Sequence, residues 1–198
     1  MSVLLSVIAA YFPYAAVTAF TPGPNNILAL HAVSQFGWRR SQKVIYGIAA
    51  GFLSVMLICG FFCWGLSQFL PAISTALIYL GALYIIWLAW HIAHSQPEAD
   101  EGRQASFLQG FALQFVNVKI YMLGITIFTA YVLPSSSEPL FAANNALALT
   151  LIGTAGFLTW GLAGSLLQKF INRYYRPFNL LMAAILLLCA LDLLLGHN

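Results

Sequence analysis

The segment of this sequence best suited to chemistry is Thr21-Pro-Gly-Pro-Asn-Asn26, which interrupts an apolar stretch. Each proline removes a backbone donor and obstructs the preceding helical turn, and it pushes the residue before it out of the α region. A helix therefore has to break here. Pro24 suits the first turn of a new helix, so we expect Asn25 and Asn26 to begin a second half-helix.

A helix broken inside a membrane offers two kinds of binding group. The N-terminus of the second half carries partial positive charge and can receive a carboxylate. The carbonyl groups freed at the end of the first half can receive an ammonium group, and they are costly in lipid unless they face protein or a water-filled cavity. The segment predicts a site for a zwitterionic amino acid. A plain structural kink is the alternative, but the amides of Asn25 and Asn26 need partners once buried, which favours a site.

Asn117 and Lys119 form the second polar feature, inside the apolar stretch 107–133. A cation within a membrane span is expensive and indicates function by default. Residues two apart do not share a face of a regular helix, so a local break would be needed for both to reach one cavity. The alternative is that the span starts later and that Lys119 extends to the membrane interface.

Other candidates for chemistry are weaker. His31 and Asp192 are titratable residues in predicted spans and could serve proton coupling, whereas Cys59 and Cys63, four apart on one helical face, are interpreted as small apolar packing residues. The sequence contains no pair of carboxylates within a span, no His/Cys cluster with metal-ligand spacing and no phosphate-binding glycine loop. We therefore expect no enzyme, no metal and no cofactor.

The elements that must position these residues are membrane helices. Of the 198 residues, 61% are hydrophobic and 7% are charged, whereas an ordinary soluble domain is about 25% charged. A soluble chain of this length could not bury so much apolar surface in one core, so the lipid bilayer is its expected solvent. The few basic residues form no arm or stripe that could follow phosphates, which excludes nucleic-acid binding.

Hydropathy predicts an all-α polytopic membrane protein with six transmembrane helices, forming a single transporter domain over residues 1–198. Seven of the eight Lys and Arg residues fall in the connections that follow the first, third and fifth spans. The positive-inside rule places these connections in the cytoplasm and both termini in the periplasm. The predicted spans cover about 3–33, 44–66, 73–92, 107–133, 140–167 and 178–195.

Three predicted spans start outside and three start inside, which is typical of an inverted-topology repeat. The two repeats would cover about 1–95 and 105–198. The segment Gly47–Phe52 in the second span resembles Gly153–Phe157 in the fifth. In such a repeat the fourth span is the counterpart of the first, so we expect breaks in spans one and four.

The motifs Pro22-Gly-Pro-Asn25 and Asn117-Val-Lys119 resemble those of the LysE/RhtB superfamily of amino-acid exporters, over the whole length of the chain. The stretches Thr21–Leu30, Tyr84–Trp90 and Ala112–Lys119 are similar to its cysteine/O-acetylserine branch. This resemblance implies export of those two amino acids across a bacterial inner membrane by proton antiport. Our own interpretation adds Asn26 to the site residues. The resemblance itself carries over six residues: Pro22, Gly23, Pro24, Asn25, Asn117 and Lys119.

Many relatives carry Asp where Asn25 stands and Pro where Val118 stands. The loss of an acid disfavours a strongly cationic cargo and leaves proton coupling without an obvious carrier. Two other classes of protein stay open at this point. A membrane thiol/disulfide redox carrier would need two cysteines able to pair, and a structural subunit would show no polar cavity at the breaks. The sequence also leaves open a homo-oligomer.

Overall fold

A computed structural model of the chain describes residues 3–65, 70–94 and 106–195. These residues form helices and contain no strand, which confirms the all-α class. The elements in chain order are α1 (Val3–Phe20), α2 (Pro24–Gly65), α3 (Leu70–Ala93), α4 (Phe107–Val116), α5 (Val118–Ile127), the π-helix η1 (Phe128–Val132), α6 (Pro139–Leu166), α7 (Gln168–Arg173) and α8 (Tyr175–Leu195).

A kink at Gly37 divides α2 into two helices, 24–36 and 38–65. Gly37 has φ 75° and ψ 165°, a backbone conformation that residues with a Cβ atom rarely adopt. The helix resumes directly after it, so Arg39, Arg40 and Lys43 lie on a helix. We expected these three residues in a non-helical connection, and that detail is wrong, because one glycine reverses the chain without a loop.

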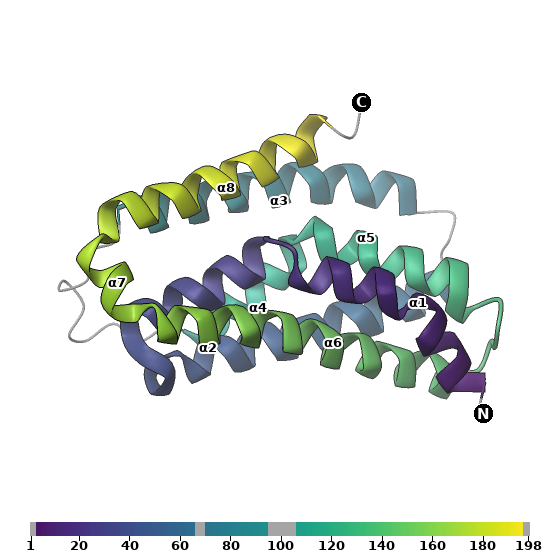
Figure 1. The fold of residues 1–198 in the computed structure, drawn as a ribbon. Helices are drawn as coiled ribbons and strands as arrows, with labels where there is room; N and C mark the ends of the chain where they lie inside the picture. The colour runs from purple at the N-terminus through teal and green to yellow at the C-terminus, as the bar shows by residue number, and fades with distance from the viewer. Residues whose placement is uncertain (1–2, 66–69, 95–105, 196–198) are drawn as a thin grey trace.

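The bend of α2 and the short helix α7 lie at one end of the bundle, whereas the N-terminus and the turn between η1 and α6 lie at the other (Figure 1). Two of the basic segments are therefore at the same end, as the positive-inside pattern requires. Arg103, which belongs to the third predicted basic connection, lies outside the described residues. The lysines and arginines of the two described segments are Arg39, Arg40, Lys43, Lys169, Arg173 and Arg176.

Two groups of helices make up the bundle. The helix α2 packs mainly against α6 and α4, and α1 packs against α6, while α3 packs mainly against α8. In Figure 1, α3 and α8 run side by side along one edge of the molecule. One hydrophobic core joins this pair to the first part of α2, and a second core joins α1, the later part of α2, α5, η1 and α6.

Glycines bring the helices of the larger group into close backbone contact. A Cβ atom at Gly47 of α2 would overlap the carbonyl oxygen of Phe107, and one at Gly110 of α4 would overlap that of Val44. A Cβ atom at Gly156 of α6 would likewise overlap the backbone of Ala19 in α1. Small residues allow such close approach between membrane helices. The two broken segments, α1–α2 and α4–α5, are each packed tightly against an unbroken helix.

Three helices in the described part of the chain are long and apolar enough to cross a bilayer: Val3–Phe20, Pro24–Cys63 and Pro139–Leu166. The pair Phe107–Val116 and Val118–Val132, bent by 59° at its break, can count as a fourth. Large apolar side chains such as Phe61 and Leu166 are 72% and 77% exposed, and such surfaces need an apolar solvent. The number of six spans and the inverted repeat remain predictions.

Candidate functional site

The first helix break occupies Thr21, Pro22 and Gly23, where the two prolines predicted it. The last turn of α1 closes with a hydrogen bond from Thr21 N to Val17 O at 3.1 Å. The first bond of α2 runs from Ile27 N to Gly23 O at 3.0 Å. Asn25 and Asn26 therefore lie in the first turn of α2, whose N–H groups have no acceptor within the helix.

The carbonyl groups freed at this break accept hydrogen bonds from side chains of the protein. Asn26 Nδ2 donates to Ala19 O and to Thr21 O, both at 2.8 Å. The indole of Trp160 on α6 donates to Phe20 O at 3.1 Å. We expected these carbonyls to receive the ammonium group of a substrate. In this conformation they are bonded to the protein itself, because carbonyls freed in a broken membrane helix need donors whether or not a ligand is present.

Lys119 also binds oxygens of the first break, and it shares Thr21 O with Asn26. Its Nζ donates to Thr21 Oγ1 at 2.9 Å, to Thr21 O at 3.2 Å and to Pro22 O at 3.3 Å. A Cβ atom at Gly23 would lie 3.1 Å from Nζ, so the absence of a side chain there leaves room for the ammonium group. The charged end of Lys119 is therefore bound at the first break, which favours the site over the alternative that this side chain extends to the membrane interface.

The second helix break is a single residue, Asn117, between α4 and α5. Its φ of −84° and ψ of 91° lie outside the helical region. Its backbone N–H bonds to Gln114 O at 3.4 Å, and its carbonyl accepts from Ile120 N at 3.1 Å. The break bends the chain by 59°, which allows Asn117 and Lys119 to face the same side although they are two residues apart.

A buried cluster of amides joins the two breaks. Asn25 and Gln114 exchange hydrogen bonds, Nδ2 to Oε1 and Nε2 to Oδ1, each at 2.9 Å. Asn117 Nδ2 also donates to Asn25 Oδ1, at 3.1 Å. All three side chains are buried. Gln114 is missing from the residues that the sequence analysis selected, although a polar side chain in the apolar stretch directly before Asn117 was a usable signal.

One acceptor of this cluster is left over. Asn117 Oδ1 is buried and has no hydrogen-bond partner among the described residues. Buried polar atoms without partners are rare in native structures, and each calls for an explanation. Since Asn117 lines the pocket between the breaks, a donor group on a ligand would satisfy this oxygen.

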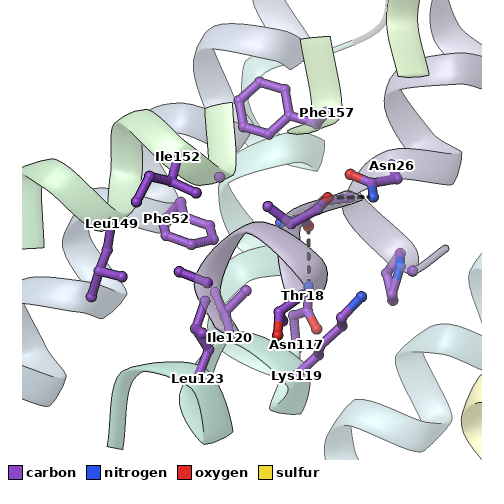
Figure 2. A pocket seen from close by; sticks show the side chains of 16 residues that line it. Thr18, Asn26, Phe52, Asn117, Lys119, Ile120, Leu123, Leu149, Ile152 and Phe157 are labelled. Atoms are coloured by element: carbon purple, nitrogen blue, oxygen red, sulfur yellow. Dashed lines mark hydrogen bonds between the residues drawn. The ribbon is translucent and has the colours of Figure 1, made fainter. Parts of the chain in front are cut away.

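The pocket between the breaks has a cavity volume of about 30 Å³. That is room for about two water molecules, and it is too small for an amino acid. Figure 2 shows the apolar side chains of Phe52, Leu149 and Ile152 across the pocket from Lys119. An apolar pocket with a few converging polar groups is the usual form of a small-molecule site. A molecule of the size of an amino acid would fit this pocket only if the pocket widened.

Six of the seven predicted site residues line this pocket. Pro22 does not, but its carbonyl oxygen binds Lys119. The structure thus brings together residues from both breaks, and their role in substrate binding remains a prediction. The six residues that line the pocket are Gly23, Pro24, Asn25, Asn26, Asn117 and Lys119.

Of the weaker candidates, His31 is buried in α2 and does not line this pocket. The side chain of Asp192 lies outside the described part of the chain. Cys59 and Cys63 are buried thiols of α2, and Cys59 packs against Gly124 of α5. In the described residues no group of three or more His, Cys, Asp or Glu side chains could hold a metal ion.

Comparison with known proteins adds a family. The model of the LysE type translocator matches residues 16–197. The cysteine/O-acetylserine efflux protein of Escherichia coli (strain K12) is 43% identical over 188 residues, which cover 93% of this chain and 96% of that protein. The protein of that name from Salmonella typhimurium is 44% identical over 186 residues, covering 92% and 95%. No solved structure matches the chain.

Proposed function

The chain belongs to the LysE type translocator family, and from this premise we propose that it exports small neutral amino acids, above all cysteine and O-acetylserine. It moves them from the cytoplasm across a bacterial inner membrane by proton antiport with alternating access. The names of its relatives support the cargo, since they match nearly the whole chain. The observation that carries the proposal is the pocket in which two helix breaks converge.

The pocket suits a zwitterion with a short side chain. The first-turn N–H groups of α2 and α5 have no acceptor within their helices and offer partial positive charge to a carboxylate. Asn117 Oδ1 offers an acceptor to an ammonium N–H. The apolar wall of Phe52, Leu149 and Ile152 suits a thiol or an acetyl group. No lining residue is acidic, so a second positive charge, as on lysine, would be uncompensated.

Alternating access requires the pocket to open in turn toward each side. The present volume of about 30 Å³ excludes the cargo, so this conformation is a closed one. Opening has to separate helices that now touch through glycines. Gly153 and Gly156 of α6 are placed for this, because one packs against the ring of Phe52 and the other against the backbone of Ala19.

We also propose six spans arranged as inverted repeats of about 1–95 and 105–198, with both termini in the periplasm. The packing supports this arrangement, because each repeat covers the broken span of the other. The helix α6 packs on the α1–α2 break, and the later part of α2 packs on α4. The two described basic segments at one end of the bundle support a cytoplasmic position for that end.

A thiol/disulfide redox carrier is not supported. The relatives are named as efflux proteins, and neither Cys59 nor Cys63 lines the pocket. Export by a variant with Cys59, Cys63 and Cys189 all replaced by alanine would exclude thiol exchange as the mechanism. Loss of O-acetylserine export in that variant would instead show that the cysteines of the protein are needed even for a substrate without a thiol, and a redox role would have to be reconsidered.

The proposed function is tested by efflux of labelled cysteine and O-acetylserine from liposomes that contain the purified protein. We expect Asn25→Ala to lower the rate at least about tenfold, because it removes bonds to both Gln114 and Asn117, each worth about 1 kcal/mol. The matched control is Asn145→Ala, a buried amide of α6 that bonds to Tyr11 and lies outside the pocket.

The control should lose stability but keep its rate per folded molecule. Unchanged efflux by Asn25→Ala would contradict the assignment of the site. Absence of any cysteine or O-acetylserine efflux by the unaltered protein would contradict the function itself.

A further inference from the structure

The pocket contains one group that can change its charge. Of the sixteen described residues that line it, Lys119 alone is titratable, and none is a carboxylate. Outside the lining, the thiol of Cys189 on α8 interacts electrostatically with Lys119. A proton that moves with the transport cycle therefore has one evident carrier at this site.

The oxygens that hold Lys119 are also those best suited to the substrate. Thr21 O, Thr21 Oγ1 and Pro22 O form a set of three acceptors, all bonded to Nζ. An α-ammonium group has three N–H donors and would be satisfied by the same set. Thr21 and Pro22 are exposed and lie beside the pocket rather than in its lining, and Thr21 O also accepts from Asn26 Nδ2. A second ammonium group at these oxygens would be repelled by that of Lys119, because no carboxylate lines the pocket to offset the two charges.

We propose that Lys119 is the proton carrier of the antiport, and that its ammonium group and that of the substrate occupy the Thr21 and Pro22 oxygens in turn. The inference rests on the proposed export function and supplies its coupling step. It explains how a pocket that lacks an acid can still exchange a substrate for a proton.

In each transport cycle one proton is released on the cytoplasmic side and one is taken up on the periplasmic side. Toward the cytoplasm, an N–H bond of the Lys119 ammonium breaks, the proton passes to water, and the electron pair stays on Nζ. The zwitterion enters, and its ammonium group takes the vacated oxygens. Toward the periplasm the substrate leaves, and the neutral amine takes a proton from external water and returns to the oxygens. One substrate moves out and one proton moves in. The closed structure, with Lys119 on the oxygens, corresponds to the proton-loaded form.

The test uses the whole protein in liposomes and separates two activities. The first is uphill transport of labelled O-acetylserine driven by an imposed pH gradient. The second is exchange of labelled for unlabelled O-acetylserine without a gradient, which needs no net proton movement. We expect Lys119→Met to lose uphill transport to the level of empty liposomes while exchange stays measurable. The matched control is Lys169→Met, on the exposed face of α7, which should keep both activities.

A second measurement does not depend on the folding of a variant. Addition of O-acetylserine to the unaltered protein in weakly buffered detergent solution near pH 7 should release about one proton per bound molecule. O-acetylserine is used because it has no thiol to titrate. Uphill transport by Lys119→Met at the unaltered rate would overturn the inference, and so would binding without proton release. An unaltered protein that neither exchanges nor transports O-acetylserine or cysteine would overturn the proposed function, and this inference with it.

Discussion

The two helix breaks meet at one pocket but are made in different ways. The break before α2 spans three residues, contains Pro22 and is followed by Pro24, and the carbonyls freed at it are bonded to Asn26, Trp160 and Lys119. The break before α5 is the single residue Asn117, has no proline, and is joined to Asn25 by a hydrogen bond from Asn117 Nδ2 to Asn25 Oδ1. The first break is imposed by the covalent structure of proline, which removes a backbone donor and obstructs a helical turn. The second break depends on hydrogen-bond partners elsewhere in the fold. Mutations of distant residues should therefore disturb the second break more than the first.

Although the two breaks are made differently, the helices around both pack through close contacts of glycine with backbone. The largest loss of stability that we predict tests these contacts. Gly156→Ala would place a Cβ atom against the backbone of Ala19 beside the first break, and Gly110→Ala would place one against the backbone of Val44, where α4 packs on α2. Backbone cannot move aside as a side chain can. We expect each variant to lose about 1–3 kcal/mol of stability, measured by thermal unfolding in detergent.

The matched control for the glycine variants is Gly161→Ala, also on α6. Its Cβ atom would meet the ring of Trp38 at 3.2 Å, and a side chain can shift by a few tenths of an ångström. We expect a clearly smaller loss there. Equal losses of stability in all three variants would mean that close backbone contact is not what holds α6 against α1 and α4 against α2.

The second break should depend on Gln114. Gln114→Leu removes the side chain that donates to Asn25 Oδ1 and accepts from Asn25 Nδ2, and it leaves a buried amide group without that partner. The expected cost is about 1–3 kcal/mol, with a loss of export at least about tenfold. Asn145→Leu, which breaks the bond to Tyr11, is the control for stability loss without loss of export. Export by Gln114→Leu at the control's level would remove the amide cluster from the mechanism.

The sequence predicted the first break and its helix start because proline acts on its own neighbours. It also selected Asn117 and Lys119, since polar residues in an apolar stretch are conspicuous. It could not show that Asn25 pairs with Gln114, because hydrogen bonds between residues 89 apart depend on the packing of α2 against α4. For the same reason it could not show that Asn26 and Lys119 hold carbonyls of the first break in this conformation. The kink at Gly37 was missed because glycine marks many positions in this chain and few of them bend it.

The substitution with the smallest expected effect gives the second break a proline like those at the first. Val118→Pro adds a proline at the first residue of α5, directly after the break. Proline is accepted there, since a first-turn N–H has no acceptor in its own helix and the fixed φ suits a helix start. The change should alter stability by less than about 1 kcal/mol and leave export within about twofold.

The added proline should also make the second break less dependent on its amide partners. We therefore expect Val118→Pro to restore part of the stability lost in Gln114→Leu when the two are combined. Thermal unfolding of the two single variants and the double variant measures this coupling. Strict additivity would show that Gln114 stabilises the packing of α4 on α2 rather than the bend at Asn117, and that the two breaks are more alike than their sequences suggest.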